Sequence, residues 1–171
     1  MATLHLMVGL PCSGKTTLAK RLEKECGALL LSPDAWQAAL FGSRYADGPF
    51  PPETLDRMHD RIESMLWKVA ARALSLGVDV ILDFGFWSRA ERDDYRQKAR
   101  ALGAGCRLHV LDPPREELFR RLAARNRAPG DDSLVIPPAC LEKWLEIYEP
   151  PGKDETGRSP GTSKRELSQN A

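Results

Sequence analysis

Short runs of apolar residues alternate along this chain with longer stretches in which apolar residues recur every three or four positions. The short runs are typical of strands buried on both faces of a parallel sheet, and the periodic stretches are typical of amphipathic helices. The alternation predicts an α/β domain with a doubly wound, mainly parallel sheet of about four or five strands and helices on both faces. The predicted strands are residues 4–8, 28–31, 78–83 and 106–111, and the predicted helices are residues 15–26, 35–41, 52–76, 89–102, 115–125 and 138–148.

The apolar patterning ends near residue 149. Residues 1–149 have the length and apolar content of one folded domain. Residues 150–171 are rich in Pro, Gly, Ser, Lys and Glu and contain almost no apolar side chains. Because such a segment buries too little surface to offset its ordering entropy, we expect it to form a disordered C-terminal tail.

The overall composition is that of an ordinary globular protein. The net charge of +1 over 171 residues provides no global attraction to nucleic acid or to an anionic membrane. No apolar run approaches the roughly 18 residues of a membrane span, and the apolar N-terminus lacks the basic segment of a signal peptide. The four cysteines are scattered without metal-ligand spacing, so we expect free thiols and a cytoplasmic protein.

The segment between the first predicted strand and the first predicted helix follows the pattern GxxxxGK[ST]. In this context, the glycines let the backbone fold around a polyphosphate, and the N–H groups and the helix N-terminus point at it. The segment therefore predicts a binding site for ATP. The expected nucleotide-binding residues are Gly9, Leu10, Pro11, Cys12, Ser13, Gly14, Lys15, Thr16 and Thr17.

Three side chains are predicted to act on the phosphates and on a magnesium ion. Lys15 supplies a positive charge for the β- and γ-phosphates, and Thr16 offers its hydroxyl to Mg²⁺. Asp83 stands at the carboxyl end of a buried predicted strand, where ligands of such sheets bind, and is the expected acidic partner of Mg²⁺. The structural alternative for Asp83 is a cap on the turn at Gly85.

Asp34 follows the second predicted strand, on the side where an acceptor of the phosphoryl group would bind. A carboxylate there is suited to take the proton of an acceptor hydroxyl. The sequence Ser-Pro-Asp before a helix is equally typical of an ordinary helix N-cap, so both interpretations stay open.

Arginines are concentrated in residues 115–127. Arg121 and Arg125 are four positions apart and share one face of the predicted helix, where they would form an arginine-bearing lid that stabilises the transferring phosphoryl group. The alternative is a solvated helix face. The arginines of this segment are Arg115, Arg120, Arg121, Arg125 and Arg127.

Other features are less specific. Phe84, Phe86 and Trp87 follow the third predicted strand and are either core residues or the wall of an acceptor pocket. The segment 42–52 is rich in Gly, Pro and aromatic residues and has the length of a binding loop. His5, His59 and His109 have no catalytic partner suggested by spacing, so we interpret all three as structural.

Five stretches together resemble the bacterial AAA-domain predicted kinases, small P-loop NTPases similar to chloramphenicol phosphotransferase, zeta toxin and the kinase domain of polynucleotide kinase. They are GLPCSGKTTLAKRL, LSPDAW, VILDFGFWSRAERDDY, LFRRLAARNRA and IYEPP, and the resemblance spans residues 4–152. It implies that Asp34 is the general base and that Arg121 and Arg125 are lid arginines. Polynucleotide kinases usually carry an arginine three residues beyond the aspartate, where this chain has Gln37.

These observations predict a kinase that uses ATP and Mg²⁺ to phosphorylate a hydroxyl of a small molecule, with Lys15, Asp34, Arg121 and Arg125 as catalytic residues. One alternative is a 5′-hydroxyl nucleic-acid kinase, which the basic stretch over residues 89–127 favours and Gln37 disfavours. Another is a nucleotide-binding switch or ATPase without an acceptor.

Overall fold

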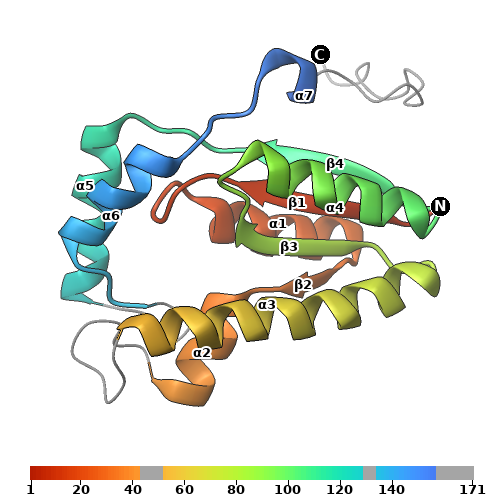
Figure 1. Cartoon of the computed structure of the whole chain (residues 1–171), viewed down its shortest axis with the longest axis horizontal. Coiled ribbons are helices and arrows are strands. Elements are labelled where there is room, and N and C mark those ends of the chain that lie inside the picture. The colour runs from red at the N-terminus through yellow and green to blue at the C-terminus, as the bar shows by residue number, and fades with distance from the viewer. Residues whose placement is uncertain (43–51, 129–133, 157–171) are drawn as a thin grey trace, which may run out of the picture.

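A sheet of four parallel strands forms the centre of the computed structural model, which describes residues 1–42, 52–128 and 134–156 (Figure 1). The strands are ordered β2-β3-β1-β4. They are β1 (Thr3–Val8), β2 (Leu29–Leu31), β3 (Val80–Gly85) and β4 (Gly105–Val110). The helices are α1 (Lys15–Cys26), α2 (Pro33–Phe41), α3 (Pro52–Ser75), α4 (Arg89–Ala101), α5 (Arg115–Arg127), α6 (Pro138–Ile147) and α7 (Lys153–Thr156). The predicted α/β class and parallel sheet are confirmed.

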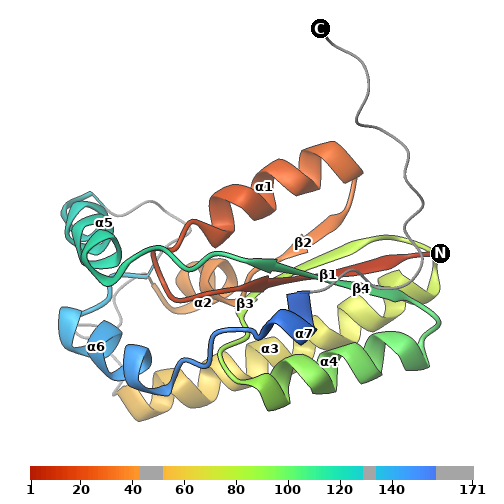
Figure 2. The same cartoon turned by 90° about the horizontal axis from the view of Figure 1, so that it is seen from above.

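Helices cover both faces of the sheet, with α1 on one side and α3 and α4 on the other (Figure 2). Leu4, Leu6 and Val8 of β1 belong to the core cluster that includes buried residues of α3 and α4. Met7, between them in sequence, packs with Ala19 of α1 in a separate cluster. Successive side chains of a strand point to opposite faces, so a sheet covered on both faces needs the continuous apolar runs seen in this sequence.

A third apolar cluster joins the end of β1 to the helices beyond β4. Leu10, directly after β1, is buried with Leu118 and Leu122 of α5 and with Leu141 of α6. This packing holds α5, the predicted arginine-bearing segment, next to the turn that follows β1 (Figure 1).

The expected disordered tail does not begin at residue 150. Residues 150–156 are described, and α7 places Glu155 against α4, where its carboxylate binds the buried guanidinium of Arg92 at 2.8 Å. Composition missed this segment because ion pairs of Asp154 and Glu155 with arginines of α4, rather than apolar area, hold it in place. Residues 157–171 lie outside the described residues, as does most of the predicted binding loop over residues 42–52.

None of the helices in the described ranges has both the length and the apolarity that crossing a membrane would require.

Candidate active site

The turn after β1 has the backbone geometry that the GxxxxGK[ST] pattern predicts. Gly9 has a φ of 145°, and a Cβ atom added there would lie 2.3 Å from the carbonyl oxygen of Leu111. Gly14 has a φ of 103° and occupies the N-cap of α1. Only glycine meets both demands without strain, so the two glycines of the motif are required by the turn itself.

Protein donors bind several carbonyl oxygens of this turn. Trp87 Nε1 donates to the carbonyl of Gly9 at 3.2 Å, and Lys15 Nζ donates to that of Leu10 at 2.9 Å. Arg121 Nη1 lies 3.2 Å from the carbonyl oxygen of Ser13. These contacts offset the negative potential of the carbonyls, which favours an anion near the turn.

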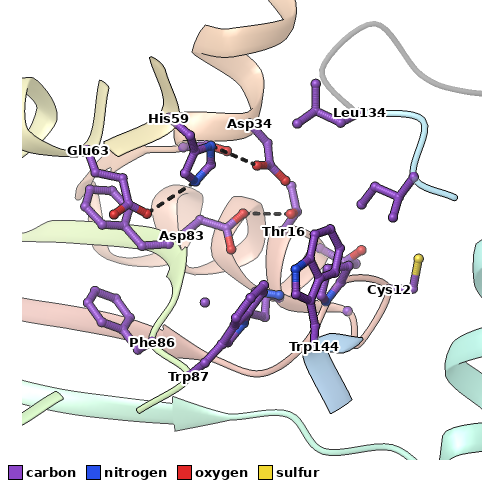
Figure 3. Close-up of a pocket in the computed structure, with 18 of the residues that line it drawn as sticks. Cys12, Thr16, Asp34, His59, Glu63, Asp83, Phe86, Trp87, Leu134 and Trp144 are labelled. Atoms are coloured by element: carbon purple, nitrogen blue, oxygen red, sulfur yellow. Dashed lines mark hydrogen bonds and ion pairs between the residues drawn. The ribbon is translucent and has the colours of Figure 1, made fainter. Parts of the chain in front are cut away.

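The turn forms one wall of a cavity of about 620 Å³. Figure 3 shows side chains from the turn, from β3 and from α3 converging on this space. It lies at the carboxyl ends of β1 and β3, the position at which parallel sheets of this kind bind ligands. Its lining residues are Pro11, Cys12, Gly14, Lys15, Thr16, Thr17, Lys20, Ser32, Asp34, Asp56, His59, Asp60, Glu63, Asp83, Phe84, Gly85, Phe86, Trp87, Glu91, Arg125, Leu134, Ile136 and Trp144.

Asp83 and Thr16 are in direct contact in this cavity. Thr16 Oγ1 donates to Asp83 Oδ2 at 2.6 Å, whereas Asp83 Oδ1 is buried without a hydrogen-bond partner. One carboxylate oxygen is thus bound by Thr16 and the other is unpartnered, so neither caps the turn at Gly85. Burial raises the pKa of Asp83 to about 6, against the opposing charge of Lys15.

These two side chains fit a magnesium ion. Mg²⁺ prefers oxygen ligands and is usually bound by one or two protein groups together with waters and substrate phosphates. The hydroxyl of Thr16 and the unpartnered Oδ1 of Asp83 supply such oxygens beside the turn. The described residues contain no group of three or more His, Cys, Asp or Glu side chains that could hold a metal by themselves.

Asp34 lies in the first turn of α2, and Ser32 takes the N-cap position. The interpretation of Asp34 as an ordinary N-cap is therefore wrong. Its side chain is 47% exposed, lines the cavity and has one carboxylate oxygen 4.0 Å from His59 Nδ1 (Figure 3). A half-exposed carboxylate in a cavity is accessible to a ligand.

His59 is the residue that the sequence interpretation missed. His5 and His109 stack on each other within the sheet, with His5 Nδ1 2.9 Å from His109 Nε2, but His59 lines the cavity. Its Nδ1 donates to Oε1 of the buried Gln37 at 2.8 Å, and its Nε2 lies 3.4 Å from Glu63 Oε1. Burial lowers the pKa of His59, but the hydrogen bond with Glu63 and the charge of Asp34 outweigh it and raise the pKa on balance.

The two lid arginines occupy different surroundings. Arg125 lines the cavity, and its Nε and Nη2 atoms are buried without hydrogen-bond partners. Arg121 instead binds the carboxylate of Glu117 at 2.6 Å and the backbone of the turn. Arg120 is 70% exposed and also pairs with Glu117, so for this residue the solvated-face interpretation is the better one. The geometry thus separates Arg125 from its neighbours.

Three aromatic residues at the end of β3 and directly after it belong both to the core clusters and to the cavity lining. Phe84, Phe86 and Trp87 all line the cavity. Phe86 is also 1% exposed and packs edge-on against Tyr95 of α4. Trp87 contacts Trp144 of α6, with their ring centroids 5.3 Å apart. The core of the domain therefore continues directly into the wall of the cavity.

The parallel sheet, the glycine-bounded turn and the cavity at its strand ends define a P-loop protein of the kinase-like type. A family model described as an AAA domain matches residues 4–151, and the chain belongs to that family. None of the curated proteins compared with this sequence matches it.

Solved structures share the fold. A chain of the Pnkp1/Rnl/Hen1 RNA repair complex is 25% identical with a TM-score of 0.67, and the match covers 85% of this chain and 43% of that one. This protein thus spans less than half the length of that relative. A sugar kinase from Janibacter sp. HTCC2649 is 22% identical, with a TM-score of 0.62 and coverage of 92% and 83%. Chaetomium thermophilum Kti12 in complex with ADP-AlF3 is 20% identical, with a TM-score of 0.65 and coverage of 92% and 86%.

Proposed function

We propose that this protein is an ATP-dependent phosphotransferase that moves the γ-phosphoryl group to a hydroxyl of a small molecule. One observation carries the proposal: Asp34, Arg125 and the Lys15 segment line the same cavity from three different elements. A cavity used only to hold a nucleotide would need neither the carboxylate of Asp34 nor the guanidinium of Arg125 in its lining.

The chemistry follows from these positions. The acceptor oxygen forms a bond to the γ-phosphorus, the bond between that phosphorus and the β,γ-bridging oxygen breaks, and ADP leaves. The hydroxyl proton passes to the carboxylate of Asp34. Lys15 and Arg125 stabilise the charge on the phosphoryl oxygens, since preorganised donors act strongly in a site with little water.

Magnesium would be held by Thr16 and Asp83. When bound, it would neutralise phosphate charge, as it does in phosphoryl-transfer enzymes generally. The turn residues from Gly9 to Thr17 would bind the phosphate chain through their backbone N–H groups. We also propose a cytoplasmic location, because all four cysteines are free thiols.

A transfer screen tests the proposal. Purified protein is incubated with [γ-³²P]ATP and Mg²⁺ and with alcohols, sugars, aminoglycosides, nucleosides and oligonucleotides, and the Lys15→Ala variant serves as the blank. We expect Asp34→Asn to lower kcat by about 10²- to 10⁴-fold while Mg·ATP still binds. Asp94→Asn, which removes an exposed carboxylate of α4 outside the cavity, is the matched control.

Two other functions are separated by the same experiment. The similarity to a chain of an RNA repair complex favours a 5′-hydroxyl nucleic-acid kinase, which predicts labelled oligonucleotide and salt-dependent retention on single strands. A switch or ATPase without an acceptor predicts that Asp34→Asn leaves ATP turnover unchanged.

A further inference from the structure

The two halves of the cavity carry opposite charges. The lysines and the arginine in its lining, Lys15, Lys20 and Arg125, come from the turn, α1 and α5. The titratable side chains that α2, α3 and α4 contribute to the lining are all carboxylates, with the exception of His59. These carboxylates are Asp34, Asp56, Asp60, Glu63 and Glu91.

Within this acidic half, Glu63 and Glu91 are more buried than Asp56 and Asp60. They come from α3 and from the first turn of α4, and both are partly buried. Burial, followed by the charge of Glu63, raises the pKa of Glu91 to about 6, against hydrogen bonds from the backbone of Ser88 and Trp87 that lower it. Among the described residues, Glu63 forms an ion pair with His59 at 3.4 Å, and Glu91 forms none.

The nearest arginines do not balance these charges. Arg92 follows Glu91 in sequence but is turned toward Glu155 and the carbonyl oxygen of Phe86. Arg61 of α3 is exposed and does not line the cavity. Two like charges in a partly buried site repel each other, so a cation that binds between them is favoured.

The cavity bears independent signs of a ligand. Asp83 Oδ1 and the Nε and Nη2 atoms of Arg125 are buried there without partners. Aromatic side chains also line the same cavity, among them Phe84, Phe86 and Trp87. Aromatic faces attract organic ammonium groups and also cover an apolar body.

We propose that the acceptor is a hydroxyl compound with a positively charged amine, which the carboxylates of Glu63 and Glu91 bind while Asp34 receives the hydroxyl. This inference rests on the proposed function and names the substrate class of the same site. It also disfavours acceptors with many negative charges, such as oligonucleotides, because they would meet carboxylates at the cavity wall.

Matched compounds of different charge test the inference. Glucosamine, glucose and gluconate share a six-carbon skeleton, and 2-deoxystreptamine and myo-inositol form a second set. Binding of each to the protein loaded with a non-hydrolysable ATP analogue is measured by calorimetry, and transfer is measured with [γ-³²P]ATP. We expect each cationic compound to bind about 10- to 100-fold more tightly than its neutral counterpart, the gain of a hydrogen bond to a charged group.

Charge-removing variants locate the amine site. Glu63→Gln and Glu91→Gln should each reduce the preference for the cationic compounds about 10-fold and leave the affinity for Mg·ATP unchanged. Glutamine at position 91 preserves the capping box in which Ser88 Oγ accepts from the Glu91 N–H, so this variant should fold normally. Glu25→Gln removes the same charge from the exposed surface of α1 and should change nothing.

The outcomes separate this inference from the proposed function. Binding of amines that depends on Glu63 and Glu91, without transfer, supports the amine site and contradicts the kinase. Transfer to glucose, gluconate or an oligonucleotide without a preference for amines supports the kinase and overturns the inference. If no cationic compound binds with a Kd below about 10 mM, the inference is also overturned, because such a Kd corresponds to less than about 3 kcal/mol of binding free energy.

Discussion

The guanidinium of Arg92 and the carboxylate of Glu155 form an ion pair in which the two side chains are 1% and 2% exposed. The residues are 63 positions apart, and the pair ties the segment after α6 to α4. The same guanidinium donates to the carbonyl oxygens of Phe86 and Glu149. Because Phe86 lines the cavity, this contact supports the cavity wall from behind.

Removing the charge of Glu155 should destabilise the protein. Glu155→Gln leaves the guanidinium of Arg92 buried without its counter-ion, a change that typically lowers the free energy of unfolding by about 3–5 kcal/mol. Urea denaturation measures the loss. Asp154→Asn, which breaks the exposed pair with Arg89, is the control and should leave the midpoint nearly unchanged. A midpoint for Glu155→Gln equal to that of this control would contradict the role of the buried pair.

The same pair should make stability sensitive to acid. Hydrogen bonds from Arg92 lower the pKa of Glu155 to about 2, whereas an unperturbed glutamate has a pKa of about 4.3. The stabilisation is therefore complete above pH of about 4.3 and is lost as the pH falls toward 2. We expect the difference in unfolding free energy between the wild type and Glu155→Gln to be constant from pH 7 to 5 and smaller at pH 3. A difference that persists unchanged at pH 3 would argue against this assignment.

Arg125 should affect transfer more than nucleotide binding. Its buried Nε and Nη2 atoms lack protein partners, so phosphoryl oxygens that develop charge are their expected acceptors. Arg125→Ala should lower kcat about 10³-fold with little change in the affinity for Mg·ATP. Arg120→Ala is the control, because that side chain is exposed and paired with Glu117. Equal losses of kcat in both variants would contradict a role of Arg125 in the transfer step.

Arg121 provides a contrasting case. It contacts the carbonyl oxygens of Cys12 and Ser13 and thereby supports the turn rather than the transferring group. We expect Arg121→Ala to weaken Mg·ATP binding while kcat at saturating ATP changes much less than in Arg125→Ala. Steady-state kinetics with varied ATP distinguishes the two effects. A loss confined to kcat would indicate that Arg121 acts in the transfer step.

The charge of Asp83 should lower the stability of the free protein and favour the binding of Mg²⁺. Burial makes its charged form costly, and Asp83→Asn keeps the shape of the side chain without the charge. We expect this variant to be at least as stable as the wild type without nucleotide, yet to need about 10-fold more Mg²⁺ for half-maximal turnover. A thermal melt and a magnesium titration measure the two effects. An unchanged magnesium requirement would show that Asp83 is not a ligand.

The sequence was sufficient to predict those features of the candidate site that depend on neighbouring residues. The turn from Gly9 to Thr16 was predictable because its glycines, lysine and threonine act through local backbone geometry. Asp34 and Asp83 were predictable as cavity residues because Asp34 follows β2 and Asp83 lies near the carboxyl end of β3, and parallel strands deliver their carboxyl ends to the same edge of the sheet. Ser88 caps α4, where its hydroxyl accepts from the Glu91 N–H, and a Ser followed by a Glu three positions later is the local sequence pattern of such a cap.

The acidic side of the cavity was not predictable in the same way. His59 and Glu63 are one helical turn apart, but the element that a helix face meets depends on how the helix packs, and α3 turns this face toward the cavity. Glu91 lies in the first turn of α4, where the local pattern indicates a helix cap and nothing about a cavity. The ion pair between Arg92 and Glu155 likewise joins residues whose proximity no local pattern records.

The sequence by itself determined the α/β class, the phosphate-binding turn and the strand-end aspartates, because these depend on contacts between near neighbours and on the periodicity of strands and helices. Only the tertiary structure decided which arginine faces the cavity, that His59 joins Asp34, and that the chain continues to pack beyond residue 149. Those relationships depend on the relative orientation of elements far apart in the chain, which the buried surfaces of the whole domain set together.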